Sequence, residues 1–177
     1  MRIVLIGIQG SGKSTQGNLL SEKFEVPYLS TGHIFRELAK GKTKTGRYIK
    51  ETMSAGYLIP DDKTLEIVGH YLGRKEYING YILDGFPRTV VQAEAFKEKI
   101  DKVVYLKVSD EEALRRLTSQ GDRPDNTSEA IQKRIEQFHE LTEPVIHYYR
   151  EKDLLIEVNG EENIQEVHKD ILDQLDK

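Results

Sequence analysis

Residues 7–14 contain the spacing Gly-x-x-x-x-Gly-Lys-Ser, which fits a phosphate-binding loop in full. Glycines let backbone N–H groups turn inward around an anion, because no Cβ blocks the approach. The lysine ammonium can reach the outer phosphates, and the hydroxyl that follows it can ligate magnesium. An apolar run precedes this segment and a helical pattern follows it, and the positive end of a helix dipole suits phosphate. The pattern therefore predicts a site for a nucleoside triphosphate, with Lys13 on the phosphates and Ser14 on Mg²⁺.

A second segment, residues 81–88, ends in Asp-Gly-Phe-Pro-Arg. Asp84 would stand at the carboxyl end of a parallel strand, where ligands bind in open α/β sheets. A carboxylate there can hold Mg²⁺ through its waters, because this ion loses its hydration shell reluctantly. Gly85 permits close backbone approach and Pro87 fixes the exit of the chain, so that Arg88 is aimed at the same edge. A hairpin turn, the common meaning of Asp-Gly, is disfavoured because the flanking segments do not read as antiparallel strands.

These two segments need elements that hold them at one edge of a sheet. Apolar runs and helical patterns alternate along the chain, which is typical of an open parallel sheet wrapped by helices. The expected strands cover residues 2–6, 27–29, 81–83, 103–108 and 154–158. Helices are expected at residues 13–24 and 161–175. Two pairs have the spacing of helix-start caps: Ser109 with Glu112, and Asn126 with Glu129.

The connection between the second and third expected strands is long. It holds about fifty residues, several times the length of a simple crossover. Helical patterns fill it at residues 30–40, 45–55 and 60–73. We expect a helical insertion that forms a second lobe and can move. A shorter polar stretch, residues 119–127, joins two helices and is expected to form a flap.

Length and charge limit the possible partners. The chain has 177 residues, which suits one domain with a small insertion. Its net charge is −4, whereas a protein that coats a polyanion is usually basic. We therefore expect no nucleic-acid partner, and we expect the basic groups that bind phosphate to be concentrated in a cleft.

Cysteine is absent from the sequence, which excludes disulfides, thiolate zinc sites and cysteine nucleophiles. This composition is compatible with a reducing cytoplasm. The apolar run at residues 3–6 is far too short for a signal segment or a membrane span. A cytoplasmic globular protein without a membrane partner is the expectation.

Taken together, the motifs resemble the adenylate kinase family of nucleoside-monophosphate kinases. The likeness runs in order along nearly the whole chain: residues 7–16, residues 30–32 with Arg36, residues 58–61, residues 84–92, Arg116, residues 123–125, Arg134 and residues 142–144. It implies a P-loop three-layer α/β/α fold, whose five-stranded parallel sheet has the order 2-3-1-4-5. It also divides the chain into a core of residues 1–29, 60–118 and 128–177, a monophosphate-binding lobe of residues 30–59 and a short lid of residues 119–127.

The resemblance implies reversible phosphoryl transfer from Mg-ATP to AMP, giving two ADP, by a monomer. It assigns ATP to Gly10, Ser11, Gly12, Lys13, Ser14, Thr15, Arg116 and Glu162. It assigns AMP to Thr31, Arg36, Tyr57, Leu58, Ile59, Gly85, Phe86, Pro87, Arg88, Gln92, Arg123 and Arg134. The residues it makes catalytic are Lys13, Arg88, Arg123 and Arg134. Magnesium would lie near Ser14 and Asp84, held largely through water, and no zinc is expected, because the lid is short and lacks cysteine.

Phosphoryl transfer needs alignment and charge stabilisation more than covalent help from the protein. The cationic residues above, with Mg²⁺, would offset the repulsion between two nucleotides. Arginine suits this role because its planar fork can bind two phosphate oxygens at once. A general base is not required, so the five histidines need no catalytic role.

Three positions depart from the family pattern. Ser14 stands where most members have glycine, and His33 stands where aspartate is usual. Gln120 stands where an arginine is common, which removes one phosphate-facing charge. None of the three changes the expected substrate class.

Several other functions remain open at this stage. The nearest is the same chemistry on UMP, CMP or GMP. AMP is favoured because the Gln92 amide offers a donor and an acceptor to a purine edge, and because Thr31 and Gln92 resemble the adenine-specific branch of the family more than the pyrimidine branch. A GTPase-like switch would need an Asn-Lys-x-Asp segment, and the sequence has none. A small-metabolite kinase is disfavoured by residues 84–92. A non-catalytic nucleotide sensor is disfavoured because Lys13 and the predicted catalytic arginines are all present.

Overall fold

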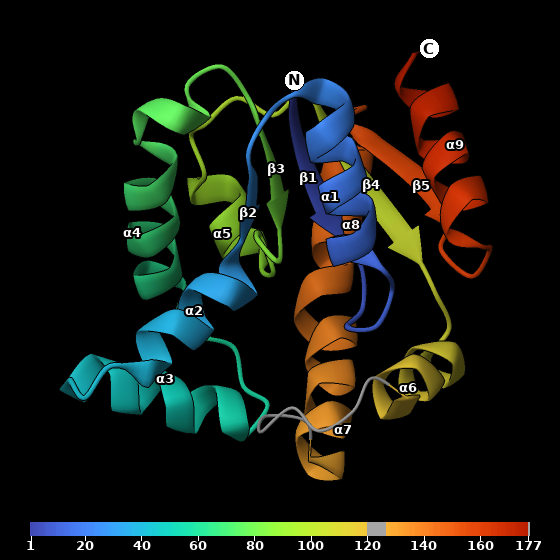
Figure 1. The fold of residues 1–177 in the computed structure, drawn as a ribbon. Coiled ribbons are helices and arrows are strands. Elements are labelled where there is room, and N and C mark those ends of the chain that lie inside the picture. The colour runs from blue at the N-terminus through green and yellow to red at the C-terminus, as the bar shows by residue number, and fades with distance from the viewer. Residues whose placement is uncertain (120–126, 177) are drawn as a thin grey trace.

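The computed structural model describes residues 1–119 and 127–176. Its centre is a parallel sheet of five strands in the order β2-β3-β1-β4-β5 (Figure 1). The strands are β1 (Arg2–Ile6), β2 (Tyr28–Ser30), β3 (Tyr81–Asp84), β4 (Lys102–Lys107) and β5 (Leu155–Asn159). The predicted order is confirmed, and the strand bounds differ from the expected ones by no more than one residue.

Helices cover both faces of this sheet, which makes the three layers (Figure 1). One face packs against α1 (Lys13–Phe24) and α9 (Ile164–Leu175). The other face packs against α4 (Asp61–Leu72), α5 (Val90–Ala95) and α8 (Glu143–Arg150). Burial of these two interfaces is the main favourable term in folding the core.

The central strand β1 shows why the chain needs two helical layers. Ile3 and Leu5 belong to the apolar cluster under α1 and α9, whereas Val4 and Ile6 belong to the cluster on the opposite face. Successive side chains of a strand point to opposite faces, so a strand with four consecutive apolar residues, Ile3 to Ile6, must be covered on both sides.

The long connection after β2 forms the predicted helical insertion. Its helices are α2 (Thr31–Lys40) and α3 (Lys44–Ser54), and they project beyond the carboxyl ends of the strands (Figure 1). Phe35, Ile49 and Ile59 form a small apolar cluster here, separate from the two clusters of the sheet. This cluster stabilises the insertion locally, while Ile34 of α2 packs into the apolar cluster on one face of the sheet.

Two helices flank the predicted flap: α6 (Asp110–Ser119) and α7 (Ser128–Gln137). The flap residues between them, 120–126, lie outside the described part of the chain. A single π-helical turn, η2 (Phe138–Thr142), joins α7 to α8, and a 3-10 turn, η1 (Lys75–Tyr77), follows α4. No sequence pattern had predicted the π-helical turn.

The helix starts test the capping predictions. Ser109 Oγ accepts a hydrogen bond from the Glu112 N–H at 3.4 Å, which confirms the first expected pair. The cap of α7 is Thr127 and not the expected Asn126, since Thr127 Oγ1 accepts from the Ala130 N–H at 3.2 Å. Each cap supplies an acceptor for a backbone donor that the first helical turn leaves unpaired.

The last helix starts three residues later than expected, at Ile164 instead of residue 161. Asn163 is its cap, because Asn163 Oδ1 accepts from the Glu166 N–H at 3.0 Å. Residues 160–162 therefore form a turn that faces the carboxyl end of β4. Within the described residues, no helix is at once long enough and apolar enough to cross a membrane.

Candidate active site

The loop between β1 and α1 turns through two glycines, Gly10 and Gly12, whose φ angles are 89° and 90°. A Cβ on Gly10 would lie 2.8 Å from the carbonyl oxygen of Ala113, whereas a Cβ on Gly12 would meet no atom within 4 Å. Gly10 is therefore required by its backbone angle and by the close approach of α6, and Gly12 by its angle alone. Gly12 also occupies the capping position before α1 and provides no side-chain cap. The first N–H donors of the helix can therefore bind an anion.

Lys13 is folded back over this loop. Its ammonium donates to the carbonyl oxygens of Gly7 at 2.7 Å and Ile8 at 2.8 Å. Burial lowers the pKa of Lys13 to about 8, Asp84 opposes the shift, and Arg88 adds to it. An ammonium held this way sits where a phosphate on the loop would meet it.

Asp84 is the last residue of β3, and its two carboxylate oxygens have different surroundings. Oδ2 accepts a hydrogen bond from the Tyr28 hydroxyl at 2.7 Å. Oδ1 is buried and has no hydrogen-bond partner among the described residues. A buried carboxylate oxygen without a partner carries an unfavourable desolvation cost, which a hydrated cation would offset.

The residues at this point suit magnesium. Ser14 lines the same cavity as Asp84. The part of the chain described here contains no group of three or more His, Cys, Asp or Glu residues that could hold a metal by themselves. One free carboxylate oxygen and a hydroxyl are a donor set that Mg²⁺ accepts, since it keeps several waters and takes other ligands from substrate phosphates.

Arg88 is held by contacts to its backbone and its side chain. Its Nε donates to the Gly85 carbonyl oxygen at 2.8 Å, and its backbone N–H donates to Gln92 Oε1 at 2.8 Å. Its own carbonyl oxygen accepts from the Thr142 hydroxyl at 2.9 Å. Burial lowers the pKa of Arg88, and Asp84 opposes that shift. A guanidinium fixed in this way presents its outer nitrogens to the cavity in one geometry.

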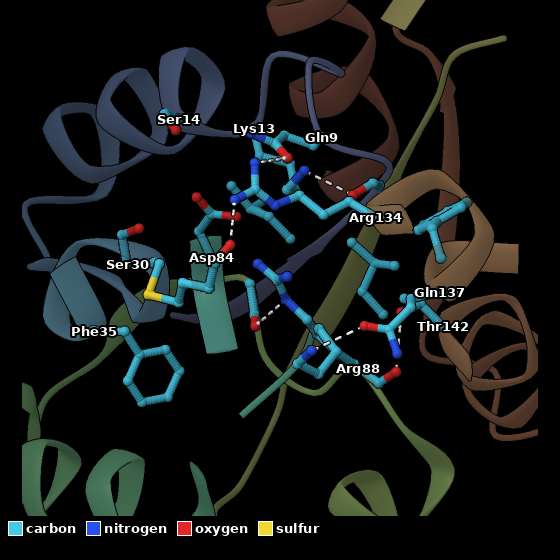
Figure 2. A pocket seen from close by; sticks show the side chains of 18 of the residues that line it. Gln9, Lys13, Ser14, Ser30, Phe35, Asp84, Arg88, Arg134, Gln137 and Thr142 are labelled. Atoms are coloured by element: carbon cyan, nitrogen blue, oxygen red, sulfur yellow. Dashed lines mark hydrogen bonds between the residues drawn. The ribbon is translucent and has the colours of Figure 1, made fainter. Parts of the chain in front are cut away.

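Arg134 reaches the same space from α7, the helix that follows the predicted lid in the sequence. Its Nη1 donates to Gln9 Oε1 of the phosphate loop at 3.2 Å, and its Nη2 donates to the Met53 carbonyl oxygen of α3 at 2.9 Å. Arg134 thereby connects three segments that are distant in the sequence. Figure 2 shows Lys13, Arg88, Arg134 and Asp84 converging from different elements.

The cavity that these residues line has a volume of about 440 Å³, within the range of small-molecule sites. Among the described residues, its lining holds four cationic side chains and one carboxylate: Lys13, Arg36, Arg88, Arg134 and Asp84. Positive charge is concentrated here although the chain carries a net charge of −4, as predicted. The other predicted residues in the lining are Gly10, Gly12, Ser14, Thr15, Tyr57, Leu58, Ile59, Gly85, Pro87 and Gln92.

Some of the predicted residues lie beside the cavity and not in its lining. Ser11 is buried, with its Oγ 3.3 Å from the Lys13 ammonium. The Thr31 hydroxyl donates to the Gly85 carbonyl oxygen at 2.9 Å, and Phe86 is fully buried. These residues support the lining instead of forming it.

Arg116 and Glu162 also lie outside the lining. Arg116 Nη1 donates to the Gly160 carbonyl oxygen at 2.9 Å, and Arg116 Nε donates to Glu112 at 2.6 Å. Glu162 is exposed and accepts from Asn159 Nδ2 at 3.1 Å. Arg116 therefore lies beside the turn at residue 160, the segment with which it was grouped in the sequence prediction. Arg123, another predicted site residue, lies outside the described residues.

The structure adds site residues that sequence reasoning did not single out. Gln9, Gln137 and Thr142 line the cavity. Gln137 Oε1 accepts from the Leu58 N–H at 2.9 Å, although 79 positions separate the two residues. The sequence did carry a signal for Thr142, because this residue begins a segment that resembles the family, residues 142–144. No sequence signal pointed to Gln137.

Comparison with known proteins agrees with this geometry. The family model for adenylate kinase matches residues 5–154. An adenylate kinase of Caldicellulosiruptor bescii is 36% identical in an alignment 212 positions long, which covers 99% of each chain. One of Clostridium botulinum (strain Loch Maree) is 36% identical in an alignment of 208 positions, which covers 97% of this chain and 96% of the relative. One of Desulfitobacterium hafniense is 35% identical in an alignment of 213 positions, which covers 99% of this chain and 98% of the relative. The chain belongs to the adenylate kinase family.

Proposed function

We propose that the chain catalyses reversible phosphoryl transfer from Mg-ATP to AMP, giving two ADP. The observation that carries the proposal is the convergence of Lys13, Arg88 and Arg134 on one cavity. The phosphate loop supplies the first of these groups, the segment between β3 and α5 the second, and α7 the third. A site of this kind can hold two phosphate chains whose negative charges would otherwise keep them apart.

The ATP phosphates would bind the loop at residues 10–15, with Lys13 against the outer phosphates. Arg116 and Glu162 would flank the adenine. The Arg116 bond to the Gly160 carbonyl oxygen supports this assignment, because it joins α6 to the turn before α9. A planar guanidinium held at such a place can stack on a base.

AMP would bind on the other side of the cavity. Its phosphate would meet Arg36 and Arg88, and Arg123 and Arg134 would close on it from the lid side. Its base and ribose would lie among the remaining residues of the proposed AMP set: Thr31, Tyr57, Leu58, Ile59, Gly85, Phe86, Pro87 and Gln92. We propose residues 30–59 as the monophosphate lobe and residues 119–127 as the lid, on a core formed by the rest of the chain. We propose that the chain acts as a monomer, since the described lining residues of one chain already include groups for both nucleotides.

Magnesium would be held near Asp84 Oδ1 and the Ser14 hydroxyl, largely through water. Bound to the ATP phosphates, it would supply positive charge to the group being transferred. The chain's own cations align the donor and acceptor phosphates and stabilise the charge that develops between them. Closure of the lobe and the lid would exclude water, which is the competing acceptor.

A substrate panel tests this proposal. ADP formation from Mg-ATP is measured with AMP, CMP, UMP and GMP as separate acceptors. We expect the highest kcat/KM with AMP. A preference for UMP or CMP would support the related pyrimidine activity, and the absence of turnover with all four would contradict a kinase function.

A further inference from the structure

A hydrogen-bond network surrounds the side chain of Gln92 and includes two residues outside the proposed AMP set, Asp61 and Thr89. Gln92 is 1% exposed, and its amide lies between two partners. Its Oε1 accepts from the Arg88 N–H at 2.8 Å, and its Nε2 donates to Asp61 Oδ1 at 2.8 Å. The same Asp61 oxygen accepts from the Thr89 hydroxyl at 2.9 Å. Asp61 is the first residue of α4, so it joins the end of the insertion to the start of α5.

The two partners allow only one orientation of the amide. The Arg88 N–H can only donate, and the Asp61 carboxylate, when ionised, can only accept. If the Gln92 amide turned over, its carbonyl oxygen would face the carboxylate and its NH₂ group would face the N–H. Both hydrogen bonds would be lost in a buried place, which is costly.

An amide fixed in this way has a defined hydrogen-bonding capacity left. One N–H of Gln92 Nε2 and one lone pair of Oε1 are not used by these two bonds. Gln92 lines the cavity, so this remaining donor and acceptor are available to a base there. The matching base edge carries an acceptor beside a donor, as adenine does at N1 and its 6-amino group. Hypoxanthine has nearly the same shape but presents a donor at N1 and an acceptor at O6.

We propose that Asp61 is a positioning residue that determines base specificity by fixing the orientation of the Gln92 amide. The inference rests on the proposed function and deepens it. Asp61 does not contact the base; it makes Gln92 present its donor and acceptor in the order that adenine requires. The monophosphate taken by the site is therefore one whose six-membered ring offers an acceptor next to an amino group.

The test compares AMP with inosine 5′-monophosphate (IMP) in the wild type and in Asp61→Asn. Asparagine can donate or accept, so in the variant only the Arg88 N–H still favours one orientation of the Gln92 amide. We expect the ratio of kcat/KM for AMP to that for IMP to fall by about tenfold or more, because one of the two bonds that hold the amide against IMP no longer discriminates between its orientations. We also expect the KM for AMP to rise and the KM for ATP to stay unchanged. Asp62→Asn is the matched control: it makes the same charge change in the same helical turn, at an exposed residue, and should leave the ratio unchanged.

Two further variants separate specificity from helix capping. Thr89→Val removes the hydroxyl that caps α5 but leaves the Asp61–Gln92 bond, so it should lower the Tm and keep the AMP to IMP ratio. In a Gln92→Ala background, Asp61→Asn should no longer change the ratio, because the two residues act through one bond. Should Asp61→Asn fail to fold, Asp61→Ala also frees the amide and takes its place.

Two results would overturn the inference while AMP turnover is intact. One is an AMP to IMP ratio in Asp61→Asn within about twofold of the wild-type ratio. The other is a change in the ratio that persists in the Gln92→Ala background. A wild type that binds AMP without phosphorylating it would contradict the proposed function instead, and the relative affinities for AMP and IMP, measured by calorimetry, would then test Asp61.

Discussion

Lys13 and Arg88 carry positive charge into a cavity where burial lowers the pKa of both groups, and Asp84 opposes the shift in each case. Charged groups in such surroundings act more strongly on a ligand than they would in water. A phosphate chain brings negative charge to the same place, so its binding favours the protonated form of Lys13. Single residues therefore already favour the binding of an anion at this site.

The pKa of Lys13 gives a prediction about these charges. Asp84→Asn removes the carboxylate that favours the ammonium, so the pKa of Lys13 should fall below its value of about 8 in the free protein. NMR titration of lysine labelled at the side chain measures it. An unchanged or raised pKa would contradict the coupling between the two residues.

The lowered pKa of Lys13 also makes the stability of the fold depend on pH. The ordinary lysine pKa of 10.5 applies to the unfolded chain, which therefore holds this proton more tightly than the folded protein. The unfavourable contribution of Lys13 to folding is complete below pH 8 and is relieved as the pH rises from about 8 to 10.5. Screening by solvent reduces this unfavourable contribution, because the Lys13 side chain is partly accessible.

Lys13 also gives a prediction about rate. Lys13→Ala should lower kcat by about two to three orders of magnitude, the loss typical of removing one key charge-stabilising donor. Steady-state turnover with saturating ATP and AMP measures the effect. Lys23→Ala is the control, because it removes an exposed lysine from the last turn of the same helix and should change little. Equal activity of the Lys13 and Lys23 variants would show that the Lys13 ammonium does not contribute to catalysis.

At the scale of elements, the phosphate loop depends on two glycines for different reasons. Gly12→Ala introduces only an unfavourable φ angle, whereas Gly10→Ala also sets a Cβ against the Ala113 carbonyl oxygen. We expect Gly12→Ala to lower the free energy of unfolding by about 1–2 kcal/mol and Gly10→Ala to lower it further. Denaturant unfolding of both variants decides this. A larger loss for Gly12→Ala would show that the approach of α6 is not what restricts residue 10.

Most of the elements could be predicted because their signals are local. The apolar runs gave the strands to within one residue, and the Ser109 cap gave the start of α6. The insertion was predicted from the length and helical patterns of the connection after the second strand, and the sheet order from motifs shared with a known family. The helix starts were harder to predict, because several side chains that could accept the capping hydrogen bond lie within a few residues of each start. The sequence alone therefore did not identify Thr127 as the cap of α7 or Asn163 as the cap of α9.

The parts of the site that sequence did not predict depend on contacts between distant segments. The Gln137–Leu58 and Thr142–Arg88 hydrogen bonds join residues 79 and 54 positions apart. The π-helical turn Phe138–Thr142 contains the threonine of the second bond, and no residue pattern predicted that turn. Gln92 was expected to read the base, yet its dependence on Asp61 becomes visible only when both side chains are placed.

At the scale of the molecule, the insertion has its own apolar cluster and is tied to α7 by two hydrogen bonds, Leu58 to Gln137 and Arg134 to Met53. This construction suits a lobe that moves as a unit when the cavity is filled. The fold therefore keeps the phosphate loop on the sheet, and the proposed AMP residues largely on the insertion and on the segment that runs from the end of β3 into α5.

Movement of this lobe and of the proposed lid gives a prediction about turnover. If opening and product release limit kcat, the rate should fall as solvent viscosity rises, because such motions displace solvent. Turnover is measured in sucrose or glycerol at fixed temperature. A rate independent of viscosity would show that chemistry, and not opening, limits the enzyme.

The account rests on transfer of phosphate to AMP in place of water, and ³¹P NMR of the protein with ATP, AMP and Mg²⁺ follows this directly. We predict that ATP and AMP decrease together, that two ADP appear for each pair consumed, and that no inorganic phosphate is released. Inorganic phosphate that grows without AMP consumption, or an ATP signal that does not change, would contradict the account.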